Sequence, residues 1–201
     1  IDTSASNPYA NVYGGAAASL STVYVYKYFD PTDTSNSWDN GQDFYVVRYA
    51  EVLLSLAEAM VQKGGYVYSD VTALVNEVRQ RADVNMPTVE EVEGTSLSKD
   101  ELLEVIKHER RVELAFEGAR FFDIRRWGIA ENVLNAEDGW IIGMKLDNAG
   151  GYQVVESGKW KGHVKVRQRT LFTSDQYVWP IPSREIELNP NLEAEPLMEI
   201  E

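Results

Sequence analysis

Three glutamates near the middle of the chain, Glu109, Glu113 and Glu117, recur at intervals of four residues. On a helix, this spacing places their carboxylates in one row along a single face. Such a row could hold a pair of metal ions inside a helical bundle. It could also supply the acid and the nucleophile of a glycosidase, which stand about 5–9 Å apart. A third interpretation is structural, with each carboxylate paired to an arginine.

The surrounding residues favour the structural interpretation. A di-metal site of this kind needs a histidine three residues after a glutamate, and neither His108 nor His163 stands in that position. Arginine beside a carboxylate lowers its pKa, whereas a glycosidase acid needs a raised pKa. We therefore predict no catalytic residue, no metal and no cofactor, with a glycosidase using Glu109 and Glu113 kept as an alternative. The arginines expected to pair with the row are Arg110, Arg120, Arg125 and Arg126.

The glutamate row lies in Ser98–Gly128, which has the pattern of a capped amphipathic helix followed by a shorter one. Ser98 and Glu101 have the spacing of a capping box. Apolar residues then recur at helical intervals, and Glu109 and Glu113 fall on the same face as these apolar residues. A carboxylate on a buried face needs a partner, so the sequence predicts an ion-paired core here.

Two further helices are predicted from periodicity, at about Phe44–Gln62 and Asp70–Ala82. The first is apolar on nearly all sides, so we expect it to be buried between neighbours. Gly64-Gly65 ends it, and Gly118 is expected to end or bend the long helix in the same way. The two helices form an antiparallel hairpin of about the length of one tetratricopeptide unit.

Beyond these helices, the sequence predicts loops and short strands. Asp83–Thr95 is expected to be a loop whose acidic cluster faces solvent. Trp160–Phe172 alternates apolar and basic residues, which is typical of a strand. We interpret its basic face as solvated or as offsetting nearby acids, and an anionic-ligand site is the alternative.

Aromatic side chains in the predicted loops are the candidates for ligand contact. Aromatic faces bind ligands, but they also dominate protein cores, so packing stays open for each of them. The candidate ligand-binding residues are Trp38, Trp140, Tyr152 and Trp160.

Composition sets further bounds. The chain has 201 residues, a formal net charge of −13 and no cysteine. This charge argues against binding a nucleic-acid backbone through bulk electrostatics, and the absence of cysteine excludes disulfides and thiolate catalysis. The chain begins at Ile1 without an initiator methionine, so we expect a trimmed piece. We predict a single, mainly α domain with an irregular lead-in at 1–43, a helical core at 44–134 and a loop-rich part with short strands at 135–201.

Four separated blocks then support a resemblance to a known family. In order and spacing they resemble the carboxy-terminal region of the SusD/RagB family of outer-membrane nutrient-binding lipoproteins, from about Tyr26 onward. Two departures stand out: the tail at Glu193–Glu201 lacks the family's Gln-Asn-Pro-Gly-like ending, and the family's amino-terminal half is absent. The blocks are Arg48–Met60 (RYAEVLLSLAEAM), Val75–Ala82 (VNEVRQRA), His108–Gly128 (HERRVELAFEGARFFDIRRWG) and Trp179–Leu192 (WPIPSREIELNPNL).

The resemblance implies a SusD-like fold and a binding protein that is not an enzyme. Family members lie on the outer face of the outer membrane of Bacteroidetes-type bacteria. They are held there by a lipid anchor that is absent from this chain. They bind glycans or sometimes peptides for polysaccharide utilisation, and they pair with a SusC-like TonB-dependent transporter. A tetratricopeptide-like scaffold that binds protein is the alternative. The family's motifs look like structural ion pairs, at Arg48, Glu51, Glu109, Glu113, Arg120, Asp123 and Arg126.

Overall fold

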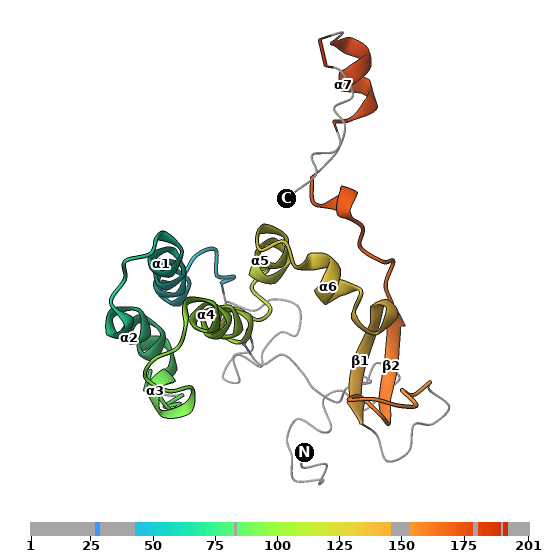
Figure 1. The fold of residues 1–201 in the computed structure, drawn as a ribbon. Coiled ribbons are helices and arrows are strands. Elements are labelled where there is room, and N and C mark those ends of the chain that lie inside the picture. Colours follow the sequence, from blue (N-terminus) through green and yellow to red (C-terminus); the bar gives the residue numbers. More distant parts are fainter. Residues whose placement is uncertain are drawn as a thin grey trace. The chain divides into compact units, whose positions relative to one another are not determined.

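A computed structural model describes residues 27–28, 43–82, 84–145, 153–178, 181–189 and 191–192. These residues are mainly helical and contain a two-stranded sheet, which confirms the predicted fold class (Figure 1). The chain divides into two compact units, one formed by Val25–Phe122 and the other containing Asp123–Glu201. The expected boundary between 134 and 135 within a single domain stays a prediction.

The core of the Val25–Phe122 unit is built from helices α1 (Tyr49–Lys63), α2 (Tyr68–Arg79), α3 (Val89–Val92) and α4 (Lys99–Glu113). Helix α1 packs against both α2 and α4 (Figure 1). The predicted hairpin of two helices is thus confirmed, although α1 begins five residues later than expected. Fully buried aliphatic side chains come from all four helices: Leu54, Val61, Val71, Val75, Val89, Leu102 and Ile106.

Burial of α1 on all sides is a prediction that the structure corrects. The side carrying Leu54 and Val61 is buried, but Tyr49 is 64 %, Val52 51 % and Leu56 48 % exposed. The reason is that the buried residues of α1 share one core cluster with residues of α2 and α4, which leaves a second apolar stripe uncovered. Helical periodicity reveals how wide an apolar face is, but not how many neighbours cover it.

The segment Asp83–Thr95, expected to be a loop, contains the short helix α3. Thr88 and Glu91 form a capping box, in which each side chain accepts a hydrogen bond from the backbone N–H of the other residue. Val89 is fully buried, and Glu90 accepts a 2.8 Å hydrogen bond from the Asn76 amide. Part of the acidic cluster is therefore structural rather than solvated. The Thr88–Glu91 spacing was the signal for this helix.

Helix α4 begins where the sequence predicts. Ser98 and Glu101 form the capping box, with Ser98 N–H donating to the Glu101 carboxylate at 2.9 Å. The helix ends at Glu113, earlier than the predicted break at Gly118. Both Phe116 (φ 65°) and Gly118 (φ 82°) adopt left-handed backbone conformations before α5 (Ala119–Arg126). Glycine adopts this conformation at little cost, but a bulky residue such as phenylalanine does so only under strain.

A buried ion pair joins α2 to α4. Arg79 Nε lies 2.7 Å from Glu109 Oε2, and the two side chains are 6 % and 7 % exposed. The predicted burial of Glu109 is confirmed, although Arg79 was not among the arginines expected to pair. Because both charges are out of water, each depends on the other for compensation.

Glu113 and Glu117 share a second group of cations. Arg48, which directly precedes α1, donates at 2.6 Å to the Glu113 carboxylate and at 2.7 and 2.8 Å to the two oxygens of Glu117. Lys27 donates to the Glu117 carboxylate and to the carbonyls of Glu113 and Ala115. The planar guanidinium of Arg48 thus holds the start of α1 to the end of α4. Glu113 also pairs with Arg81.

The second unit carries a short antiparallel sheet formed by β1 (Trp140–Lys145) and β2 (His163–Gln168). Trp140 pairs with Gln168 and Lys145 with His163, with two bulges between them. The strand predicted within Trp160–Phe172 is confirmed over its central six residues. The other elements around the hairpin are α6 (Ala130–Leu134), η1 (Ala136–Gly139), η2 (Ser174–Gln176) and α7 (Ser183–Leu188).

A sharp turn and a pair of hydrogen bonds connect this hairpin to the end of α6. Before β1, the three successive residues Glu137, Asp138 and Gly139 all have positive φ, so the chain turns sharply into the strand. After β2, the side-chain amide of Asn135 donates to the Phe172 carbonyl at 2.8 Å and accepts from the Phe172 N–H at 2.7 Å. The buried Phe172 ring packs in a small cluster with residues of α5 and α6. These contacts hold the Trp140 end of the hairpin, where β1 begins and β2 finishes.

Substitution of Glu109 tests the buried ion pair. We expect Glu109→Gln to lower the free energy of unfolding by about 3–5 kcal/mol, because it leaves Arg79 buried without a counter-charge. Glu104→Gln on the same helix is the matched control. Its carboxylate is 72 % exposed, so a change below about 1 kcal/mol is expected. Urea unfolding of both variants measures the difference, and equal losses would contradict the assignment.

The pH dependence of stability tests the Arg48 cluster. Burial alone would raise the pKa of Glu117, but the hydrogen bonds from Arg48 and Lys27 outweigh it and hold the pKa below its usual value of 4.5. Since the folded pKa is depressed, the stabilisation is complete above that value and is lost as the pH falls through the folded pKa. We expect Glu117→Gln to be less stable than the wild type at pH 7 and to lose less stability on acidification. Parallel unfolding curves between pH 7 and 3 would exclude this role.

Candidate functional site

The structure places two of the four candidate ligand-binding residues. Trp38 and Tyr152 lie outside the described residues. Trp140 is the first residue of β1, and Trp160 lies in the turn that precedes β2. Both tryptophans are half-buried, so each ring is partly packed and partly open to solvent.

The Trp160 ring contacts one lysine and one imidazole. The Nζ of Lys159 lies over the indole, 4.9 Å from the ring centroid. The His163 ring meets the indole edge to face at 5.3 Å, and His163 Nδ1 lies 3.0 Å from the Trp160 carbonyl oxygen. Lys145, which pairs with His163 across the sheet, runs its side chain beside Gly162. This end of the hairpin therefore combines one aromatic ring with several lysines.

Gly162 lies in this turn beside the Lys145 stem. Its φ of +82° is left-handed, and a Cβ built there would lie only 3.2 Å from Cε of Lys145. A larger residue would be strained and would push the lysine stem away from the turn. A Cβ at this position would move the Lys145 stem by a few tenths of an ångström, and the positive φ is what favours glycine here.

Trp140 has a similar environment at the other end of the hairpin. The Nζ of Lys165 lies over its indole at 5.4 Å from the centroid. Glu137 and Asp138 immediately precede Trp140 in the chain. The positive charge near this ring is therefore partly offset by two acidic residues, whereas Glu156 is the one acidic residue described near the Trp160 turn.

The two tryptophans do not share one binding platform. Trp140 pairs at one end of the sheet and His163, three residues after Trp160, pairs at the other. At about 3.4 Å per strand residue, the two ends are separated by roughly 17 Å. Each Lys–Trp pair is thus a separate small surface. The run Lys159-Trp160-Lys161 was the sequence signal for the first of these surfaces.

Charge on the hairpin is opposite in sign to that of the chain. Its described residues, 140–145 and 153–169, contain six basic side chains and a single acidic one, Glu156. The whole chain has a formal net charge of −13. Lys161, Arg167 and Arg169 are exposed, so this surface can attract anions.

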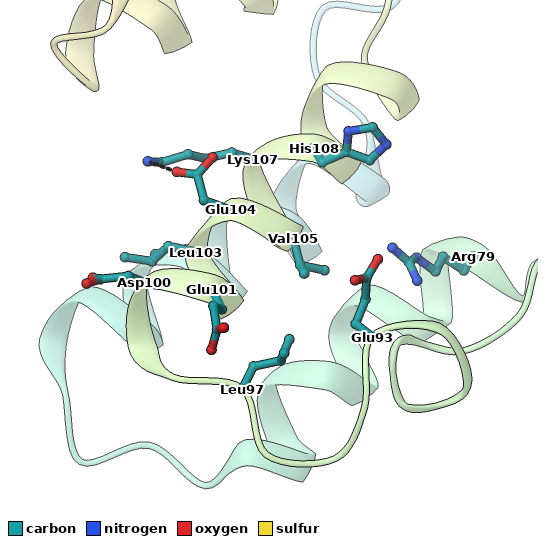
Figure 2. Close-up of a pocket in the computed structure, with 10 residues that line it drawn as sticks. All are labelled: Arg79, Glu93, Leu97, Asp100, Glu101, Leu103, Glu104, Val105, Lys107 and His108. Atoms are coloured by element: carbon teal, nitrogen blue, oxygen red, sulfur yellow. Dashed lines mark hydrogen bonds and ion pairs between the residues drawn. The ribbon is translucent and has the colours of Figure 1, made fainter.

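A pocket of about 940 Å³ in the other unit is a weaker candidate. Figure 2 shows that charged side chains of α4, with Arg79 and Glu93, surround it. Many of these groups already serve the fold: Arg79 pairs with Glu109, Glu101 belongs to the capping box, and Lys107 pairs with Glu104. None of its lining residues is a phenylalanine, tyrosine or tryptophan, so it offers no aromatic stacking platform for a sugar ring.

The glutamate row is occupied by arginine and lysine. Glu109 pairs with Arg79, while Glu113 and Glu117 pair with Arg48. Among the described residues, no group of three or more His, Asp or Glu side chains could hold a metal ion. Carboxylates held in this way act as structural anions, and the lowered pKa of Glu117 is the opposite of what a glycosidase acid requires.

The remaining motif residues named from the sequence are spread over both units. Asp123 pairs with Arg126 through the guanidinium Nη2 at 2.9 Å. Arg120 is half-buried on α5. Glu51 lines a small cavity of about 180 Å³ that Glu117 also lines. Sequence reasoning missed Lys27, Arg79 and Arg81 as partners of the glutamate row.

Comparison with known proteins identifies relatives over most of the chain. The SusD family matches residues 2–197. SusD-like protein P2 of Formosa agariphila is 29 % identical over 144 residues, covering 66 % of this chain and 28 % of that protein. SusD-like protein P38 of the same organism is 30 % identical over 149 residues, covering 73 % and 23 %.

A solved structure gives the same result. The crystal structure of a SusD-like protein from Bacteroides fragilis aligns with a TM-score of 0.56 and 28 % identity, over 76 % of this chain and 25 % of that protein. The chain thus spans about a quarter of the length of these relatives. Within the described part of the chain, no helix combines the length and the apolar character needed to cross a membrane. On the match over residues 2–197, this chain belongs to the SusD family.

Proposed function

We propose that this chain is part of a cell-surface protein that binds a glycan or another nutrient for uptake and is not an enzyme. The observation that carries this proposal is the family match over residues 2–197. SusD-like proteins are nutrient-binding accessory proteins of the outer membrane. In the proposed system, the full-length protein is lipid-anchored on the extracellular face and delivers its ligand to a SusC-like TonB-dependent transporter.

The hairpin supplies groups suited to a sugar. An indole face can pack against the C–H groups of a pyranose ring, and neighbouring polar groups can bond its hydroxyls. Trp160 is half-buried, which holds the ring in position. Lys159 lies over the ring, Lys161 follows it in the chain and Lys145 runs beside Gly162 of the same turn, so all three ammonium groups are available as hydrogen-bond donors. Trp38 and Tyr152 remain proposed contacts outside the described residues.

The non-catalytic role is supported by the state of the carboxylates. Hydrolysis of a glycosidic bond needs one carboxylic acid that stays protonated near neutral pH. Glu109 and Glu113, the residues of the glycosidase alternative, instead accept hydrogen bonds from arginines. Both carboxylates are thus engaged as hydrogen-bond acceptors by guanidinium groups of the scaffold.

A tetratricopeptide-like scaffold for protein binding is the second candidate. The exposed apolar stripe of α1, formed by Tyr49, Val52 and Leu56, favours it, because such a stripe can receive the apolar face of a partner helix. This stripe lies in the Val25–Phe122 unit, whereas the Lys–Trp pairs lie in the other. The two candidates can therefore be tested with separate substitutions.

Substitution of Trp160 tests the glycan proposal. In calorimetric titrations of the full chain against an oligosaccharide panel, we expect Trp160→Ala to weaken binding by about two- to tenfold, the worth of one aromatic contact. The melting temperature should change little, because the ring is only half-buried. Leu56→Ala on α1 is the control and should leave glycan affinity unchanged. Failure of every oligosaccharide to bind the wild type would contradict the proposal, and capture of a peptide lost in Leu56→Ala would support the scaffold instead.

A further inference from the structure

We propose that the Trp160 end of the hairpin is a subsite for acidic groups of an anionic oligosaccharide, one that carries uronate carboxylates or sulfate esters. This inference rests on the proposed glycan-binding function and adds the charge of the ligand. The subsite consists of Trp160 with Lys145, Lys159 and Lys161.

Positive charge is concentrated on the hairpin. Six of the seven charged side chains in the described hairpin are basic, in a chain whose formal net charge is −13. An acidic saccharide is repelled by the bulk of the chain and attracted at this surface. On the described surface, electrostatic attraction therefore favours binding of an acidic saccharide at the hairpin. A neutral saccharide gains nothing from this arrangement.

A lysine lies over the ring of each described tryptophan of the hairpin. Lys159 Nζ lies 4.9 Å from the centroid of Trp160, and Lys165 Nζ lies 5.4 Å from that of Trp140. A sugar that stacks on the indole must first move the ammonium group aside. A neutral sugar gives the displaced lysine only hydroxyl oxygens as uncharged acceptors. An acidic sugar gives it a carboxylate or sulfate, with which it forms a charge-assisted hydrogen bond.

The lysine therefore acts as a cover that an acidic ligand removes more easily than a neutral one. The long side chain of Lys159 allows this movement, because a lysine carries its ammonium group on a flexible four-carbon stem and has no fixed hydrogen-bond geometry. Lys145, beside Gly162, and the exposed Lys161 provide further positive charge for the same acidic group. The combination of ring and cations fits a saccharide acid better than a free inorganic anion, which has no face to stack on an indole.

The Trp160 end is the stronger of the two surfaces. Near Trp140, Glu137 and Asp138 directly precede the ring and offset part of the charge of Lys165. Near Trp160, the flanking residues are Lys159 and Lys161, and Lys145 pairs with His163 beside this turn, against one described acidic residue, Glu156. The ends are roughly 17 Å apart along the sheet, so an oligosaccharide is needed to reach both, with the exposed Arg167 between them.

The test is a calorimetric comparison of an acidic and a neutral oligosaccharide on the full chain. The probes are tetragalacturonate, a sulfated galactan tetrasaccharide and the neutral maltotetraose. We expect at least one acidic probe to bind ten or more times tighter than maltotetraose, and its affinity to fall as NaCl is raised. The two acidic probes distinguish carboxylate from sulfate recognition.

Paired charge substitutions locate the site. The double variant Lys145→Gln/Lys159→Gln should lose at least tenfold in affinity for the acidic probe. The control Lys63→Gln/Lys99→Gln makes the same change in net charge at exposed positions of the other unit and should change affinity less than twofold. Lys159→Gln alone should weaken binding of the acidic probe without weakening binding of maltotetraose. This difference is expected if Lys159 covers the Trp160 ring and pairs with the acidic group once displaced. Unchanged melting temperatures show that both double variants are folded.

Three results would overturn the inference. Maltotetraose binding as tightly as the acidic probes would overturn this inference and leave the proposed glycan function standing. An equal loss in the control double variant would show a bulk charge effect and also overturn it. Binding of anionic phosphatidylglycerol vesicles in place of every oligosaccharide would overturn both the inference and the proposed function.

Discussion

Carboxylates that lie on an apolar helix face must be met by guanidinium groups, and this requirement organises the helical unit. Glu109 on α4 is held by Arg79 of α2, and Glu113 and Glu117 are held by Arg48 at the start of α1. Each pair joins segments that are far apart in sequence but adjacent in the core. An aliphatic core tolerates small shifts of one helix along another, whereas a forked guanidinium fixes both distance and angle. The ion pairs therefore set the register in which α1, α2 and α4 pack.

This arrangement explains why the recognisable sequence blocks do not coincide with the candidate binding surface. The blocks around Arg48, Arg79 and Glu109 carry partners that must match one another, so their spacing is tied to the fold. The Lys–Trp pairs lie on a short hairpin that is attached to α6 through Asn135 and Phe172. A surface of this kind can vary in sequence without disturbing the helical unit. The Lys–Trp pairs proposed for binding therefore lie outside the blocks whose ion pairs tie them to the fold.

Much of the fold could be predicted from local patterns. The capping box at Ser98 and the burial of Glu109 follow from interactions within one helix or from its periodicity. Local patterns did not reveal which arginine meets which glutamate: Arg79 was missed, and Arg48, named from the family motifs as an ion-pair position, meets Glu113 and Glu117 only after distant segments pack. The exposed stripe of α1 was missed for a related reason, since periodicity does not count neighbours. At the candidate site, sequence identified Trp140 and Trp160, but only the sheet register shows that they stand at opposite ends of the hairpin.

The clustering of basic residues on the hairpin also bears on how the molecule behaves in bulk. The sequence has an isoelectric point of about 4.6, which by itself suggests a protein that a negatively charged chromatography resin would not retain. A resin, however, samples the surface patch by patch, at distances comparable to the Debye length of about 10 Å at moderate ionic strength. At that ionic strength, a cation exchanger can therefore hold this acidic protein by one small positive face. Its average charge is a poor guide to what it adheres to.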